Sequence, residues 1–196
     1  MSKIAGRYIA ARVTSRRQLL KISVGCMAGA ALGSVAGCGA IRFDIGQAVP
    51  EQRVMGNVLG SLLGTFLPSP FALTVNLAQE TQARGTGPAQ SAGLKALSFR
   101  ITNIANPPRS TDNFDFVDRI EIFIESSKSG SSLSKQKIAD LLMVPRGATT
   151  LNLQCDPSVD LVPYINEGSR IASTATGRAP AQDVTFDGLI TVEVRV

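Results

Sequence analysis

Alternating apolar and polar residues define several short segments of this chain. The clearest segment is Phe116–Glu125, in which Ile120, Ile122 and Ile124 alternate with charged side chains. A period of two places those isoleucines on the buried face of a β-strand and the charges in water. The same alternation predicts strands at Phe71–Ala78, Leu94–Thr102, Ala148–Cys155, Ser169–Thr176 and Val184–Val196.

Two further segments leave the type of element open. Lys137–Val144 fits either a strand or a single helical turn, and Val159–Gly168 fits a strand or a short helix that ends at Gly168. Glycine, proline, asparagine and serine separate the elements, as in chains built of many short strands. The sequence therefore predicts an all-β domain over residues 71–196, a two-layer antiparallel β-sandwich of immunoglobulin-like type. The paired cysteines and the tryptophan of true immunoglobulin domains are missing, so this analogy covers architecture alone.

Residues 38–70 precede the predicted sandwich, and we expect them to form a tether followed by an apolar segment. Gly39–Arg53 is of mixed composition and is the predicted tether. From Val54 to Leu67 the apolar residues recur at helical spacing, while Gly56, Gly60 and Gly64 weaken any helix by about 1 kcal/mol each. We expect this segment to cover the sandwich as a short helix or an edge strand. The alternatives are a membrane-surface helix and a helix that docks on a partner.

The first 37 residues have the pattern of an export signal. Every charged residue before Asp44 is basic, and the stretch from Ile22 to Gly37 is uncharged, small and only modestly hydrophobic. A basic segment, a short apolar segment and a small-residue processing site are the three parts of a secretory signal. The stretch is also too short for a typical transmembrane helix, which needs about 20 apolar residues. Residues 1–37 are therefore interpreted as a signal peptide with a helical apolar part.

Two motifs in this region resemble known export families. Ser15-Arg16-Arg17-Gln18-Leu19-Leu20-Lys21 resembles the twin-arginine signal of bacteria. Val35-Ala36-Gly37-Cys38 is similar to the lipobox of bacterial lipoproteins. The first resemblance implies that Arg16 and Arg17 direct export of a folded chain. The second implies that Cys38 becomes the lipid-carrying first residue of the mature protein.

The lipoprotein resemblance also implies a location and leaves alternatives open. Such a protein is anchored in the cell envelope and faces the periplasm or the exterior. Gly39 and Ala40 follow the cysteine in place of the aspartate that favours inner-membrane retention in some bacteria, so we prefer the outer membrane. The ordinary export route also tolerates paired arginines. A cytosolic helix with a basic end and a buried structural thiol at Cys38 are the non-export alternatives.

Composition argues against several classes of function. Six of the twenty basic residues precede Cys38, which leaves fourteen against fifteen acidic residues in the mature chain. Nucleic-acid binding needs a basic face, and we expect none here. The chain has no histidine, which excludes histidine-dependent catalytic triads and histidine-ligated zinc.

The remaining candidates for chemistry are few. Cys155 is the single cysteine of the predicted domain. We expect it to be a small buried side chain rather than a reactive thiol. Asp112, Asp115 and Asp118 could offer oxygen ligands to Ca²⁺, but their spacing does not match an EF-hand loop. We therefore predict no catalytic residues, no metal site and no cofactor.

The sequence thus favours a lipid-anchored binding or scaffolding module without catalytic activity. The predicted partner is another protein of the envelope, in an envelope or secretion complex. Loops 85–93 and 126–134 are the predicted contact regions. The alternative is a periplasmic metal-dependent binder or hydrolase that uses the carboxylates of Asp112–Asp118. A third alternative is lipid carriage, suggested by the uncharged stretch from Val54 to Gln79.

Overall fold

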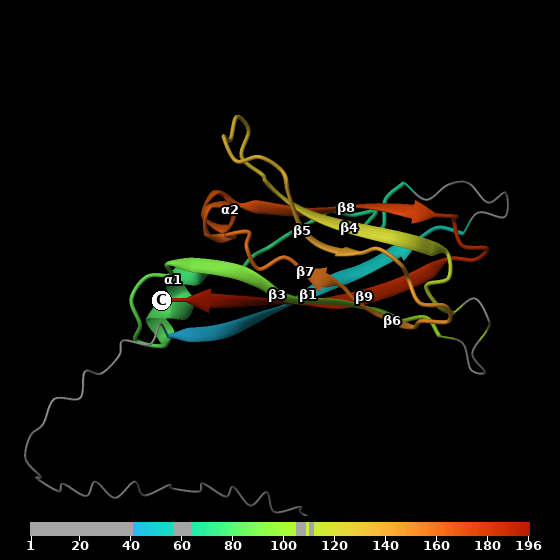
Figure 1. The fold of residues 1–196 in the computed structure, drawn as a ribbon, viewed down its shortest axis with the longest axis horizontal. Helices are drawn as coiled ribbons and strands as arrows, with labels where there is room; N and C mark the ends of the chain where they lie inside the picture. The colour runs from blue at the N-terminus through green and yellow to red at the C-terminus, as the bar shows by residue number, and fades with distance from the viewer. Residues whose placement is uncertain (1–40, 57–63, 105–108, 110–111) are drawn as a thin grey trace, which may run out of the picture. The chain divides into compact units, whose positions relative to one another are not determined.

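Two antiparallel β-sheets packed face to face form the folded part of the chain, as the computed structural model shows (Figure 1). The structure describes residues 41–56, 64–104, 109 and 112–196. The chain divides into two units, Met1–Gly37 and Cys38–Val196, and the described residues all belong to the second. The predicted two-layer antiparallel sandwich is therefore confirmed.

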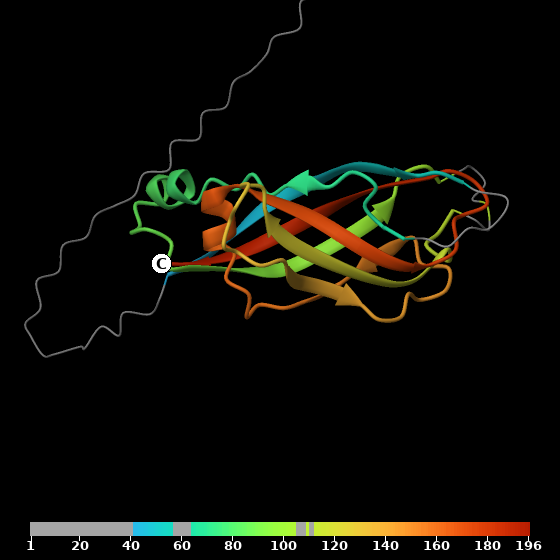
Figure 2. The same ribbon diagram turned by 90° about the horizontal axis from the view of Figure 1, so that it is seen from above.

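One sheet has four strands and the other has five. The first sheet has the order β1-β9-β3-β6, and the second has the order β2-β8-β4-β5-β7. Two short helices, α1 and α2, complete the described fold (Figures 1 and 2). The bounds are β1 Arg42–Val54, β2 Phe71–Ala72, α1 Leu77–Ala83, β3 Ser91–Ile101, β4 Val117–Ser126, β5 Gln136–Leu141, β6 Thr150–Asn152, β7 Gln154–Cys155, α2 Val162–Glu167, β8 Ser169–Gly177 and β9 Val184–Arg195.

The strand order corrects the immunoglobulin-like prediction. The first half of the chain pairs with the second half in reverse, as β1 with β9, β2 with β8, β3 with β6 and β4 with β5. In an immunoglobulin-like sandwich several sequence neighbours pair directly. Among the described strands only β4 and β5 are paired neighbours in the sequence, and most connections cross between the sheets. This reversed pairing is the arrangement of a jelly roll.

The predicted core positions are buried. Ile120, Ile122 and Ile124 of β4 are fully inaccessible, and Leu97, Phe99 and Ile101 of β3 are nearly so. At the centre, the Phe66 ring stacks on the Phe186 ring with centroids 4.5 Å apart. The Phe99 ring meets Phe66 edge-on at 5.0 Å. These contacts join a segment outside the strands to the first sheet and anchor the sandwich interior.

The predicted tether Gly39–Arg53 is wrong over most of its length, because Arg42–Val54 is the edge strand β1. Residues 42–48 of this strand are exposed or half-buried, while Val49, Gln52 and Val54 are buried. Phe43, Ile45 and Val49 do fall on alternate positions, but Gly46 and Pro50 are poor strand formers. Pro50 is tolerated because it lies in an irregularity between Val49 and Gln52 on an edge strand.

The predicted strand Phe71–Ala78 is mostly not paired. Only Phe71 and Ala72 form β2, and helix α1 begins at Leu77, inside the predicted strand. The burial alternation nevertheless continues through Leu73 and Val75. Asn76 ends this extended segment because its side-chain Oδ1 accepts a hydrogen bond from the Gln79 amide at 3.0 Å and caps the helix.

The structure corrects one further predicted strand and decides the two segments that the sequence left open. The predicted single strand Ala148–Cys155 is two strands, since β6 belongs to the first sheet and β7 to the second. Lys137–Val144 contains the strand β5, and Val159–Gly168 contains the helix α2. Gly168 ends α2 with a φ of 85°, a conformation that favours glycine.

The segment Val54–Leu67 is only partly described, and Asn57–Leu63 lies outside the described residues. Val54 ends β1, while Phe66 and Leu67 are buried in the core. The backbone amides of Phe66 and Leu67 both donate to the Ser173 hydroxyl, at 3.0 and 2.6 Å. The described end of the segment therefore packs on the sandwich. Within the described part of the chain, no helix is long and apolar enough to cross a membrane.

Candidate functional site

The residues that the sequence marks most strongly lie outside the described part of the chain. Arg16, Arg17 and Cys38 all precede Ile41, the first described residue. Their predicted roles in export and lipid attachment therefore stay predictions. The geometry that can be built from described residues is that of the sandwich surface.

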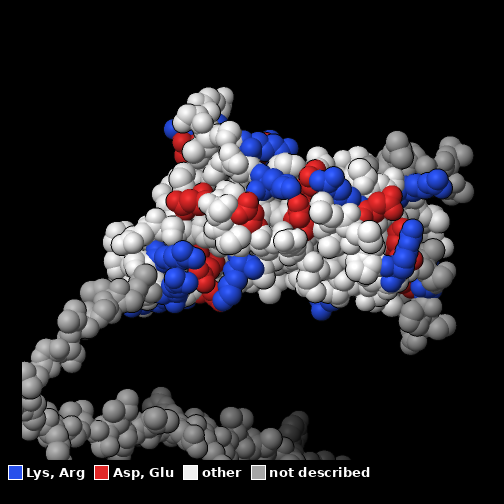
Figure 3. All heavy atoms as spheres, in the orientation of Figure 1, with Lys and Arg blue, Asp and Glu red and all other residues white. Residues whose placement is uncertain are grey.

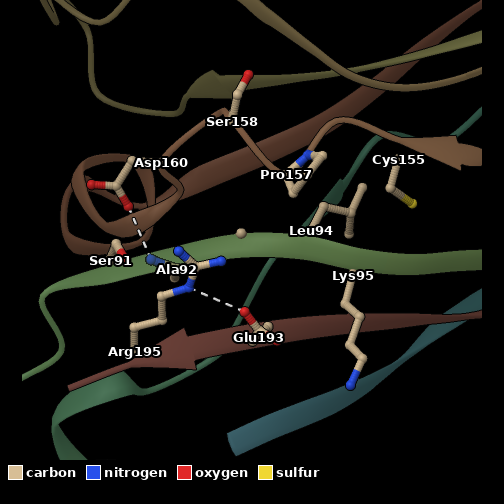
Figure 4. A pocket seen from close by; sticks show the side chains of 11 residues that line it. Ser91, Ala92, Leu94, Lys95, Cys155, Pro157, Ser158, Asp160, Glu193 and Arg195 are labelled. Atoms are coloured by element: carbon tan, nitrogen blue, oxygen red, sulfur yellow. Dashed lines mark hydrogen bonds and ion pairs between the residues drawn. The ribbon is translucent and has the colours of Figure 1, made fainter. Parts of the chain in front are cut away.

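A cavity of about 490 Å³ lies on the first sheet, between the start of β3 and the loop that joins β7 to α2 (Figure 4). Its floor includes Gly93, and its wall is formed by Cys155, Pro157 and Ser158. A Cβ atom on Gly93 would lie 3.1 Å from the Pro157 carbonyl oxygen, so a side chain there would push the wall outward. Glycine at this position therefore keeps the loop close to the sheet.

The loop is fastened to β3 at both ends of the cavity. The Leu153 amide donates to the Leu97 carbonyl at 2.9 Å, and the Leu161 amide donates to the Ala92 carbonyl at 2.7 Å. Between these points the chain leaves β3 and pairs with β5 of the other sheet as β7. The cavity is the space that this change of sheet leaves open.

Charged groups of both signs line the cavity, and each forms an ionic or hydrogen-bonding contact. Lys95 donates to Asp44 at 2.6 Å, and this hydrogen bond raises the pKa of Lys95. Arg195 donates to Glu193 at 3.1 Å. Asp160 accepts hydrogen bonds from the amides of Ala92, at 3.0 Å, and Val162. These ion pairs and hydrogen bonds already occupy the charged groups, so the arrangement suits contact with a polar molecule better than proton transfer.

Cys155 borders this cavity, but its surroundings do not activate the thiol as a nucleophile. Burial raises the pKa of its thiol, although a hydrogen bond from the Leu97 backbone acts in the opposite direction. Its Sγ lies 3.7 Å from the Leu153 carbonyl oxygen. A raised pKa keeps the thiol protonated at neutral pH, whereas thiolate is the reactive form.

We expect Cys155 to react slowly with a thiol reagent in the folded protein. With Cys26 and Cys38 replaced by serine, the rate of reaction with an aromatic disulfide at pH 8 should be several-fold lower than in urea. The midpoint of the pH–rate profile should lie above that of the unfolded chain, because burial raises the pKa. A native rate equal to the unfolded rate would contradict this assignment.

The carboxylates Asp112, Asp115 and Asp118 lie in and after the connection between β3 and β4. Asp112 Oδ2 accepts a hydrogen bond from the Arg109 amide at 2.8 Å, and Asp115 Oδ1 accepts one from the Gly147 amide at 2.6 Å. These bonds fold the connection and join it to the turn before β6. Among the described residues, no group of three or more acidic, cysteine or histidine side chains has a metal-binding arrangement.

The two predicted contact loops both lie in the described part of the chain. Residues 85–90 connect α1 to β3, and residues 91–93 begin β3. Residues 126–134 follow β4 and are held to α2, because Ser126 and Ser131 both donate to Glu167. These two hydrogen bonds lower the pKa of Glu167, the bond from Ser131 having the larger effect. Tyr164 further donates to the Ser134 carbonyl at 2.6 Å.

Sequence reasoning missed the cavity, and no local signal could have found it. Its charged residues come from β3, β9 and the loop before α2, which are far apart in the chain. Their proximity depends on the pairing of Ser91 with Arg195 and of Gly93 with Glu193.

No protein-family model matches the chain, and no curated protein matches it. Among solved structures, a decameric BFDV capsid protein is 9% identical with a TM-score of 0.42, over 81% of this chain and 100% of that chain. A 60-mer BFDV capsid protein is 11% identical with a TM-score of 0.36, over 80% of this chain and 94% of that chain. Similarity at this level carries no functional argument.

Proposed function

We propose that this protein is a bacterial envelope lipoprotein, anchored through acylated Cys38, whose sandwich is a non-catalytic binding or scaffolding module. The observation that carries the proposal is the order of the two motifs, SRRQLLK and then VAGC, immediately before the folded domain. The partner that we propose is another protein of the envelope, in an envelope or secretion complex. An outer-membrane location remains our preference, because no aspartate follows Cys38.

The architecture is compatible with this role. Strand β1 begins at Arg42, so the domain starts directly after the proposed acylated residue. Cys155 is the free cysteine of the described part, so that part contains no disulfide that would have to form after export. A domain of this kind can fold in a reducing cytoplasm, which the twin-arginine route requires.

Mass spectrometry of the protein purified from membranes tests the proposal directly. The expected mature chain begins at Cys38 and carries a diacylglyceryl group on that residue. A chain that still begins at Met1, or one without the lipid mass, would overturn the assignment.

We expect export to depend on the arginine pair. Changing Arg16→Lys and Arg17→Lys together should reduce the processed protein in the envelope to near background, since the twin-arginine motif is defined by those two residues. The matched control is Arg7→Lys with Arg12→Lys, which keeps the same charge and should leave export unchanged. If the Arg16 and Arg17 variant is exported normally, the ordinary export route is the correct one.

A further inference from the structure

The end of the sandwich at which β1 begins contains three separate parts of the chain. The Val196 amide donates to the Ile41 carbonyl at 3.0 Å, and the Gln90 amide donates to the Arg195 carbonyl at 2.8 Å. The Arg84 guanidinium lies 4.2 Å from the centre of the Phe43 ring, which places the end of α1 beside β1. We call this surface, formed by Ile41, Arg42, Arg84, Gln90 and Arg195, the proximal end.

The length of chain before Ile41 limits how far this end can lie from Cys38. Three peptide steps of 3.8 Å separate Cys38 from Ile41, so the two Cα atoms are at most about 11 Å apart. Strand β1 then runs away from this point for 13 residues, about 40 Å at roughly 3.3 Å per residue. A lipid on Cys38 therefore holds one particular end of the sandwich close to the membrane.

At the proximal end, the charged residues that pair across β1 and β9 carry charges of the same sign. Arg42 pairs with Arg195 in the last row of the ladder, and Asp44 pairs with Glu193 two residues further in. The arginine side chains are 57% and 47% exposed. Arg84 adds a third guanidinium at the end of α1, one helical turn beyond Glu80. The last row of the ladder is thus basic, and its guanidinium groups complement the phosphates of lipid headgroups.

Figure 3 shows basic and acidic side chains side by side at the left end of the face in view. Because the arginines have carboxylate partners, charge alone gives this end only a modest attraction for anionic lipid. Chain length is therefore the main argument for the contact, and the arginine row is the second.

We propose that the proximal end is a lipid-contacting surface, so that the sandwich stands on the membrane with its long axis directed away from it. This inference rests on acylation of Cys38 and adds the orientation of the domain to it. The opposite end, where Leu142 and Met143 are 62% and 80% exposed, would then face away from the membrane. The turn that carries these residues is held there because the Val144 amide donates to the Asp118 carbonyl at 3.1 Å.

Spin labels on the acylated full-length mature protein test this orientation. In a Cys155→Ser background, one label is placed by Ala83→Cys at the proximal end and another by Met143→Cys at the opposite end. The protein is reconstituted in vesicles of phosphatidylethanolamine and phosphatidylglycerol that contain a nickel-chelating lipid. We expect relaxation by the lipid-bound nickel to be several-fold stronger at residue 83 than at residue 143.

A variant with a lengthened tether provides the matched control. Inserting a flexible Gly/Ser linker after Ala40 should bring the two relaxation rates toward equality, because the longer tether releases the end from the surface. Equal rates without the insertion, or a stronger effect at residue 143, would overturn the proposed orientation. Failure of the protein to float with the vesicles would instead overturn acylation itself, so the two failures are distinguishable.

Discussion

Changing Cys38→Ala is expected to abolish incorporation of a labelled fatty acid and to remove the protein's stable attachment to the membrane. Each buried methylene contributes about 0.8 kcal/mol, and a single acyl chain already binds only marginally. Losing all of the acyl chains should therefore remove essentially the whole affinity of the anchor. Metabolic labelling with a clickable fatty acid, followed by membrane fractionation, measures both effects.

The signal peptide complicates fractionation, because a Cys38→Ala chain can keep its uncleaved apolar segment. A second variant therefore replaces residues 1–38 with an ordinary cleavable signal, and it should appear in the soluble periplasmic fraction. The matched cysteine control is Cys155→Ala, which should keep both the label and the attachment. If the Cys38→Ala variant still incorporates the labelled fatty acid, the lipid is attached elsewhere and the lipobox interpretation is wrong.

Changing Phe66→Ala is expected to destabilise the fold by about 3–5 kcal/mol, the usual cost of removing a buried aromatic side chain. Phe66 is fully buried, stacks on Phe186 at 4.5 Å and lies 5.0 Å from Phe99. Removing its ring leaves a cavity between the two sheets. Urea unfolding of the chain from residue 38, with Cys38→Ser, measures the change in free energy.

The comparison with an exposed neighbour of the same segment makes this test specific. Met55 is 64% exposed, so Met55→Ala should change the free energy of unfolding by less than about 0.5 kcal/mol. A similarly small effect at Phe66 would favour the alternative in which this segment docks on a partner or a membrane surface. A large effect at Phe66 shows that the segment belongs to the core of the domain.

Local alternation was sufficient to predict strands β4 and β9. Over residues 120–124 of β4 and 190–194 of β9 a β-branched residue recurs at every second position, and Ile120, Ile124, Val192 and Val194 are all fully buried. This result does not depend on which strand lies beside them, because a strand with one buried face shows a period of two next to any neighbour. The alternation in β3 is interrupted at Lys95 by an irregularity in its pairing with β9.

The predictions of a tether at Gly39–Arg53 and of a single strand at Ala148–Cys155 were wrong because the local sequence pattern is weak or misleading there. Strand β1 has only a few apolar residues and contains Gly46 and Pro50, so its sequence alone predicts a tether. Its pairing with β9 makes it a strand. The chain at Leu153 changes from one sheet to the other, although both flanking segments alternate as one strand. Hydrogen bonds to distant strands decide both cases.

The sequence by itself determined the β class of this domain, its principal core residues and the motifs that predict export and acylation at Cys38, because each is written in neighbouring residues. Only the tertiary structure decided the jelly-roll order, the place of β1 in the sandwich, and the cavity where β3 meets the loop before α2. Those features depend on pairings between residues far apart in the chain, and such pairings leave no local period in the sequence.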